Sequence, residues 1–80
     1  MDKSEIRSKI KHVIGQILEK DVSEITDDSN FVFDLGASSM QSLQLIAAFE
    51  EEFGIEMDQE KAMEVQTVSG AVDFVSACLN

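Results

Sequence analysis

Apolar residues recur at helical spacing in four separate stretches of the chain. In the first stretch, the apolar residues recur at the spacing that places them on one side of a helix, which we expect to be buried: Ile6, Ile10, Val13, Ile14, Ile17 and Leu18. The basic residues Lys3, Arg7 and Lys11 fall on the other side, which we expect to be solvated. The first stretch therefore predicts an amphipathic helix packed on a core.

The second stretch predicts a helix over Ser39 to Phe53. Leu45, Phe49 and Phe53 repeat at four-residue spacing and form its core stripe, with Ile46 beside them. Gly54 follows as the glycine that ends a helix in a left-handed conformation. A second apolar line is rotated away from the first and consists of Met40, Leu43 and Ala47. This line either widens the core contact or is left on the surface.

Two further helices complete the pattern. A short third helix is predicted after Asp58 as N-cap, with Ala62, Met63 and Val65 turned inward. A fourth begins after Thr67 and buries apolar residues at helical spacing, namely Val68, Ala71, Val72, Val75 and Leu79. No segment reads as a strand. The sequence predicts an all-α fold: a small four-helix bundle with a short third helix and a long loop between helices one and two, in which residues 1–80 form a single domain.

The long loop covers about residues 20 to 37. It is rich in Asp, Ser, Thr and Asn, which favour turns, and its apolar residues are expected to hold it on the core: Val22, Ile25, Phe31, Val32, Phe33 and Leu35. The run from Asp27 to Asn30 lacks the alternating ligands, glycine and terminal glutamate of a calcium loop. A loop of this length in a small domain is more often functional than idle.

Charge narrows the range of partners. The net charge is −10, and from Asp21 onward Lys61 alone opposes 13 acidic residues, a balance of 1 − 13 = −12. Phosphates would be repelled, so nucleic acid and anionic membranes are excluded as expected partners and basic protein surfaces are favoured. The alternative is that the acidity only keeps a small protein soluble and monomeric.

Other residues point to no chemistry of their own. Cys78 cannot form an internal disulfide and is expected to be a packing residue or an incidental free thiol. His12 has no second ligand at metal spacing, and no carboxylate is evident to orient it for a hydrolase mechanism with Ser39. No apolar run is long enough to span a bilayer. We expect a cytoplasmic protein without a metal site or membrane insertion.

The serine pair at the start of the second helix divides into two roles. Ser38 and Gln41 match a capping box, in which each side chain bonds the other residue's backbone N–H. Ser39 then becomes the first helical residue, with a free hydroxyl at the positive end of the helix dipole, where a phosphoester would be stabilised. Glu50, Glu51 and Glu52 oppose the same dipole at the other end of the helix, which a basic partner would explain.

Taken together, these features resemble an acyl carrier protein over essentially the whole chain. The resemblance is carried by Phe31–Ala37, by Ser39, Leu43 and Leu45, by Phe49–Glu56, and by Thr67, Val68 and Ala71–Asp73. It implies a non-catalytic carrier. Ser39 would receive 4'-phosphopantetheine from coenzyme A through a phosphopantetheinyl transferase, and the thiol of that arm would hold acyl groups as thioesters.

The resemblance also implies which surface of the chain binds the partner enzymes. Acyl-loading and acyl-processing enzymes would dock basic patches on the second helix, against Met40, Leu43, Ala47, Glu50 and Glu51. Family members sequester the acyl chain between their helices. The pathway would be fatty-acid, lipid or polyketide-type biosynthesis.

Departures from the family pattern favour a specialised carrier. Ser38 stands where fatty-acid carriers usually have aspartate, Gln41 and Gln44 replace residues that are commonly acidic, and Asp58 replaces a proline. A peptidyl or aminoacyl carrier, or an unmodified acidic interaction module, are the alternatives. The initiating methionine favours a free-standing chain, and a monomer is expected.

Overall fold

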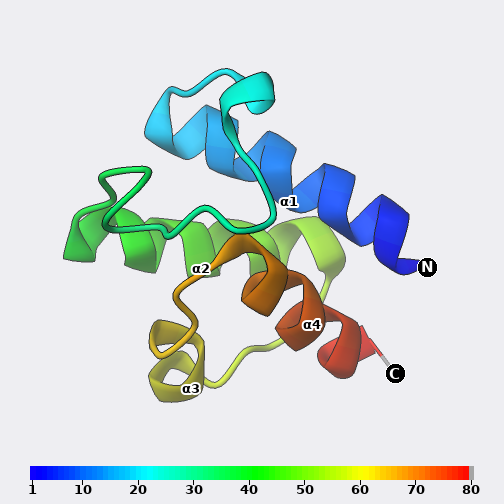
Figure 1. The fold of residues 1–80 in the computed structure, drawn as a ribbon. Helices are drawn as coiled ribbons and strands as arrows, with labels where there is room; N and C mark the ends of the chain where they lie inside the picture. Colours follow the sequence, from blue (N-terminus) through cyan, green and yellow to red (C-terminus); the bar gives the residue numbers. More distant parts are fainter. Residues whose placement is uncertain (80) are drawn as a thin grey trace.

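The part of the chain that the structure describes folds into four α-helices and one short 3-10 helix. The computed structural model describes residues 1–79, which form α1 (Lys3–Leu18), η1 (Val22–Glu24), α2 (Ser39–Phe53), α3 (Gln59–Met63) and α4 (Val68–Leu79) (Figure 1). Helix α1 packs against both α2 and α4, and α3 lies against α2. The predicted all-α fold with a short third helix is confirmed.

Helix α1 supplies the largest share of the core. Asp2 caps it, with its Oδ1 accepting a hydrogen bond from the Glu5 N–H at 2.9 Å. Five of the six predicted core residues are buried, namely Ile6, Ile10, Val13, Ile14 and Leu18, while Ile17 is partly buried and packs on the edge of the core. The helix ends at Leu18, and its C-cap residue Glu19 adopts a left-handed conformation.

Helix α2 has the bounds that its sequence predicts. Leu45, Phe49 and Phe53 are buried, and Gly54 ends the helix with a φ of 63°. The Gly54 and Ile55 N–H groups both donate to the Glu50 carbonyl, which satisfies the end of the helix. The helical period and the cap residues at both ends were therefore sufficient to place α2.

The last two helices are confirmed, with corrections to the predicted burial of three residues. Asp58 caps α3 and Ala62 is buried, but Met63 is 43% exposed and Val65 is only partly buried. In α4 the predicted residues are buried except Leu79, which is 36% exposed. A helix as short as α3 has room for few inward positions, and Leu79 lies in the last turn of α4, where little of the core remains to cover it.

The long loop is held at three points rather than along its whole length. Ile25, Phe31 and Leu35 are buried, whereas Val22, Val32 and Phe33 are exposed, which corrects the expectation that all six bind the core. Phe31 N–H donates to the Gln66 carbonyl at 2.9 Å, within an isolated antiparallel bridge that joins Asn30 to Thr67. The loop is thereby fixed to the segment that precedes α4.

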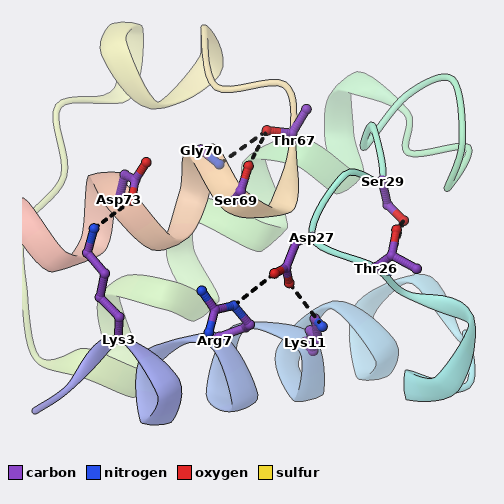
Figure 2. Close-up of polar contacts among 10 residues, drawn as sticks. All are labelled: Lys3, Arg7, Lys11, Thr26, Asp27, Ser29, Thr67, Ser69, Gly70 and Asp73. Atoms are coloured by element: carbon purple, nitrogen blue, oxygen red, sulfur yellow. Dashed lines mark hydrogen bonds and ion pairs between the residues drawn. The ribbon is translucent and has the colours of Figure 1, made fainter.

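The same loop satisfies the start of α4. The Val68 and Ser69 N–H groups donate to the carbonyls of Ser29 and Asp27, at 3.1 and 2.9 Å. The Thr67 hydroxyl accepts from the Gly70 N–H at 3.1 Å, as Figure 2 shows. These bonds satisfy N–H groups that have no partner inside the helix.

An ion-pair cluster joins the loop to α1. Asp27 lies between Arg7 and Lys11, with each cation 3.1 Å from one of its carboxylate oxygens (Figure 2). Arg7 and Lys11 are therefore partly buried, and the expectation that both are simply solvated is wrong. Lys3 stays exposed and pairs with Asp73 of α4 at 2.9 Å. Three of the basic residues of α1 thus fasten it to other parts of the fold.

Two residues that could carry chemistry of their own, His12 and Cys78, lie on the surface. His12 is exposed, as expected. Cys78 is an exposed free cysteine, which rules out the packing role and leaves the alternative of an incidental free thiol. Among residues 1–79 no group of His, Cys, Asp or Glu side chains is placed to hold a metal ion. Within that range, no helix has both the length and the apolar character needed to cross a bilayer.

Candidate functional site

The candidate site begins at the joint between the long loop and α2. Ser38 is the N-cap: its Oγ accepts from the Gln41 N–H at 3.1 Å, and Gln41 Oε1 accepts from the Ser38 N–H at 3.0 Å. These two bonds make up a complete capping box, which occupies the Ser38 hydroxyl. Gly36, two residues earlier, has a φ of 71°, a conformation that a residue with a side chain rarely adopts.

Ser39 is the first residue of α2 and has a different environment. Its side chain is exposed, and its hydroxyl forms no hydrogen bond with any residue of the described chain. The first N–H groups of a helix lack intrahelical partners and carry a partial positive charge. The Ser39 oxygen is therefore accessible to a reagent, in a place where a phosphate would be electrostatically favoured.

A cavity of about 490 Å³ opens beside Ser39. Its walls come from the long loop, from α2, α3 and α4, and from the segments that join α2 to α3 and α3 to α4. Most of the lining is apolar, including Phe31, Leu45, Ile46, Phe49, Met57, Ala62, Val65, Ala71 and Phe74. Ser38, Ser39 and Ser42, at the start of α2, also line the cavity. A hydrocarbon chain attached near Ser39 would find an apolar space directly beside its attachment point.

The cavity could not be located from the sequence. Its lining residues are scattered from Asn30 to Phe74, and several of them, such as Met57 and Phe74, belong to no predicted core stripe. Both are partly buried in the structure. A weak signal was present, because Met57 lies between two helices and Phe74 lies beside the buried stripe of α4.

The second apolar line of α2 lies outside the core. Met40 is 70% exposed, Leu43 is 41% exposed and Ala47 is exposed as well. The line therefore does not widen the core contact, and the alternative that it is left on the surface holds. Large exposed apolar side chains in a row are typical of an interaction surface.

The acidic end of α2 divides into residues with different surroundings. Glu50 is partly buried, and its Oε2 accepts from the Met57 N–H at 2.9 Å, which fastens the segment after α2. Glu51 and Glu52 are exposed, and neither forms an ion pair with a described residue. The placement of Glu50 against the helix dipole thus has a cause within the fold, which the sequence did not reveal.

Comparison with known proteins identifies the family of the chain. Residues 8–75 match the model of a family described as "Phosphopantetheine attachment site". Among solved structures, the chain resembles one described as a candidate acyl carrier protein (Rv0033) from Mycobacterium tuberculosis. The two are 32% identical with a TM-score of 0.84, over 90% of this chain and 96% of the other.

The match to the attachment-site family runs through both the capped start of α2 and most of the helices that enclose the cavity. Members of the family are non-catalytic carriers of a covalent 4'-phosphopantetheine, and they work with a phosphopantetheinyl transferase and with biosynthetic enzymes. The extent of both matches shows that this chain belongs to the acyl carrier protein family.

Proposed function

We propose that Ser39 is the attachment point of 4'-phosphopantetheine. The observation that carries this proposal is the position of its hydroxyl, which is exposed and unbonded at the start of α2, on the wall of an apolar cavity. Ser38 is a poorer acceptor because its oxygen already serves the capping box. Ser42 also lines the cavity, but it lies one turn further into the helix and is partly buried.

The chain's residues fit the group in two ways. The start of α2 favours the phosphate, through the helix dipole and the free N–H groups of the first turn. The bound arm supplies a thiol that holds acyl groups as thioesters. Attachment forms a bond between Ser39 Oγ and the phosphorus next to the pantetheine, while the pyrophosphate bond of coenzyme A breaks and its nucleotide part leaves. The serine proton passes to a base of the transferase.

The cavity supports acyl cargo. Phe31, Phe49, Met57 and Phe74 present apolar surface, and burial of a hydrocarbon chain is favourable by roughly 0.8 kcal/mol for each methylene removed from water. An aminoacyl group would bring a charged amine into the same space at a cost in desolvation. The lining therefore favours an acyl carrier over an aminoacyl carrier.

The outward face of α2 is the proposed docking surface for partner enzymes. Met40, Leu43, Ala47 and Glu51 follow one another at spacings of three or four residues and share one side of the helix. All four are exposed. Glu50 belongs to the same surface, although its bond to Met57 gives it a second role. An apolar strip with an acidic end fits partners with basic patches.

We infer the pathway, the compartment and the oligomeric state from the charge and composition of the chain. Ser38, Gln41 and Gln44 leave the first half of the docking helix without charge, which favours a specialised lipid or polyketide-type pathway over bulk fatty-acid synthesis. The single cysteine fits a reducing cytoplasm. The acidity of the chain opposes self-association and favours a monomer that acts as one carrier domain.

Intact-protein mass spectrometry tests the proposal. The protein is incubated with coenzyme A and a broad-specificity phosphopantetheinyl transferase. We expect the wild type to gain the mass of one phosphopantetheine, Ser39→Ala to gain nothing, and Ser42→Ala, as the matched control, to be modified. An unchanged wild type, or modification that persists in Ser39→Ala, would refute the assignment.

A further inference from the structure

The rim of the cavity carries apolar side chains that the fold leaves in water. Phe33 is 87% exposed and Val32 is 56% exposed, in the loop segment just before α2, and both line the cavity that Ser39 also lines. Met63 of α3 lines it too and is 43% exposed. A phenylalanine this exposed contributes little to folding, and its position beside other exposed apolar side chains indicates an interaction site.

The turn that presents Phe33 is firmly held. Asn30 Oδ1 accepts hydrogen bonds from the N–H groups of both Val32 and Phe33 at 2.9 Å, and Asp34 Oδ2 accepts from the Asn30 N–H at 2.7 Å. The Ala37 N–H closes the segment by donating to the Phe31 carbonyl at 2.8 Å. The backbone of Phe33 is thus fixed before any partner arrives. Such preorganisation lowers the entropy lost on binding and is typical of an anchor residue.

The charge around Phe33 restricts the kind of partner. Asp34 follows it directly, and no lysine or arginine occurs between Asp21 and Glu60. A second copy of this chain would bring the same negative charge, and an anionic membrane would be repelled. The surface fits a protein that carries an apolar pocket flanked by basic side chains.

We propose that Phe33 is a docking anchor for the phosphopantetheinyl transferase, which binds it in an apolar pocket flanked by basic residues while it modifies Ser39. The inference rests on the proposed attachment at Ser39. The transferase must bring coenzyme A to the Ser39 oxygen, and Phe33 and Ser39 border one cavity. An enzyme that reaches this oxygen therefore meets the Phe33 ring.

Initial-rate kinetics of the modification test this inference. We expect Phe33→Ala to raise the KM for the carrier about tenfold or more with kcat within about twofold, since truncation of an anchor residue commonly has an effect of this size. Phe33→Leu, which keeps an apolar side chain, should lie between Phe33→Ala and the wild type. Val22→Ala is the matched control, because Val22 is also an exposed apolar residue of the long loop but does not line the cavity.

A competition experiment measures the binding of the carrier to the transferase separately from the rate of modification. The Ser39→Ala protein should inhibit modification of the wild type competitively, and adding Phe33→Ala to it should raise its inhibition constant about tenfold. Circular dichroism checks that each variant retains its helices. If the wild type is modified but Phe33→Ala leaves both KM and the inhibition constant within twofold, the docking inference is overturned while the proposed function stands. If the wild type is not modified at all, the proposed function fails first.

Discussion

Acidic side chains have opposite surroundings in two regions of the molecule. Near α1, Asp27 and Asp73 are each paired with basic side chains, and those pairs join α1 to the long loop and to α4. On the outward face of α2, Glu51 has no basic partner among the described residues and shares one side of the helix with exposed Met40 and Leu43. The first region uses its charge within the fold, and the second leaves both charge and apolar surface for other molecules.

The largest effect on stability is expected at Asp27, whose two ion pairs join the long loop to α1. We expect Asp27→Asn to lower the free energy of unfolding by about 1–2 kcal/mol, between the values typical of exposed and buried pairs, because Arg7 and Lys11 both lose their charged partner. Arg7 Nε and Asp27 Oδ1 are themselves shielded from water, which supports a value above that of an open surface pair. Urea denaturation measures the change. Asp28→Asn, at the exposed neighbouring position, should change stability by less than about 0.5 kcal/mol, and an equal loss in both variants would contradict the role of the pairs.

The cap of α2 gives the next largest effect. Ser38→Ala removes the hydrogen bond that the Ser38 hydroxyl accepts from the Gln41 N–H. The loss should lower the free energy of unfolding by about 1 kcal/mol. Ser39→Ala should cost less, since the Ser39 hydroxyl has no hydrogen bond to lose. Thermal or urea denaturation of the two variants compares them directly. If Ser39→Ala proved the more destabilising, the division between cap and attachment point would be wrong.

At Glu51, one substitution should change the stability of the fold and the binding of partners in opposite directions. Glu51→Lys replaces a charge that opposes the dipole of α2, so it should stabilise the fold by about 0.3–1 kcal/mol. The same change should weaken docking of a basic partner, and the wild-type interaction should itself weaken as salt rises. Modification kinetics at two salt concentrations, together with urea denaturation, measure both effects.

The neighbouring Glu50 provides the contrast. Glu50→Lys should instead lose stability, because its carboxylate accepts the Met57 N–H. Docking that is indifferent both to Glu51→Lys and to salt would show that the apolar line governs binding on its own.

The smallest effect is expected at Asp21, which caps η1. Hydrogen bonds from the Ser23 backbone N–H and then from the Ser23 hydroxyl lower the pKa of the Asp21 carboxyl. Because the pKa is lower in the folded state, the Asp21 carboxylate stabilises the fold at pH values above the ordinary aspartate pKa. This stabilisation is lost as the pH falls through the pKa of the folded state. Titration of the carboxyl by NMR should show the low pKa in the wild type and a rise toward the ordinary value in Ser23→Ala. No rise would indicate that the backbone bond alone sets it.

The sequence was informative where one element decides the outcome. Helical period and caps located all four helices, since α1 and α2 each carry a buried stripe and a cap within a few residues of one another. The free hydroxyl of Ser39 followed from the serine pair in the same way, and the resemblance to acyl carrier proteins indicated this residue as the attachment point. In both cases the determining residues are close together along the chain.

It was less informative where distant segments meet. The pairing of Asp27 with Arg7 and Lys11, the bond from Met57 to Glu50, and the cavity all depend on how the loop and helices pack. The expectation that Val32 and Phe33 hold the loop on the core was also wrong. Apolar character alone does not say whether a turn directs a side chain inward or outward. These features required the three-dimensional arrangement.

The central claim is that Ser39, and not its neighbour, holds the prosthetic arm. Fragmentation mass spectrometry of a peptide spanning residues 31–53, prepared after incubation with coenzyme A and the transferase, tests it most directly. The account predicts one added phosphopantetheine, located on Ser39. An added group located on Ser38 or Ser42, or a peptide of unchanged mass, would contradict it.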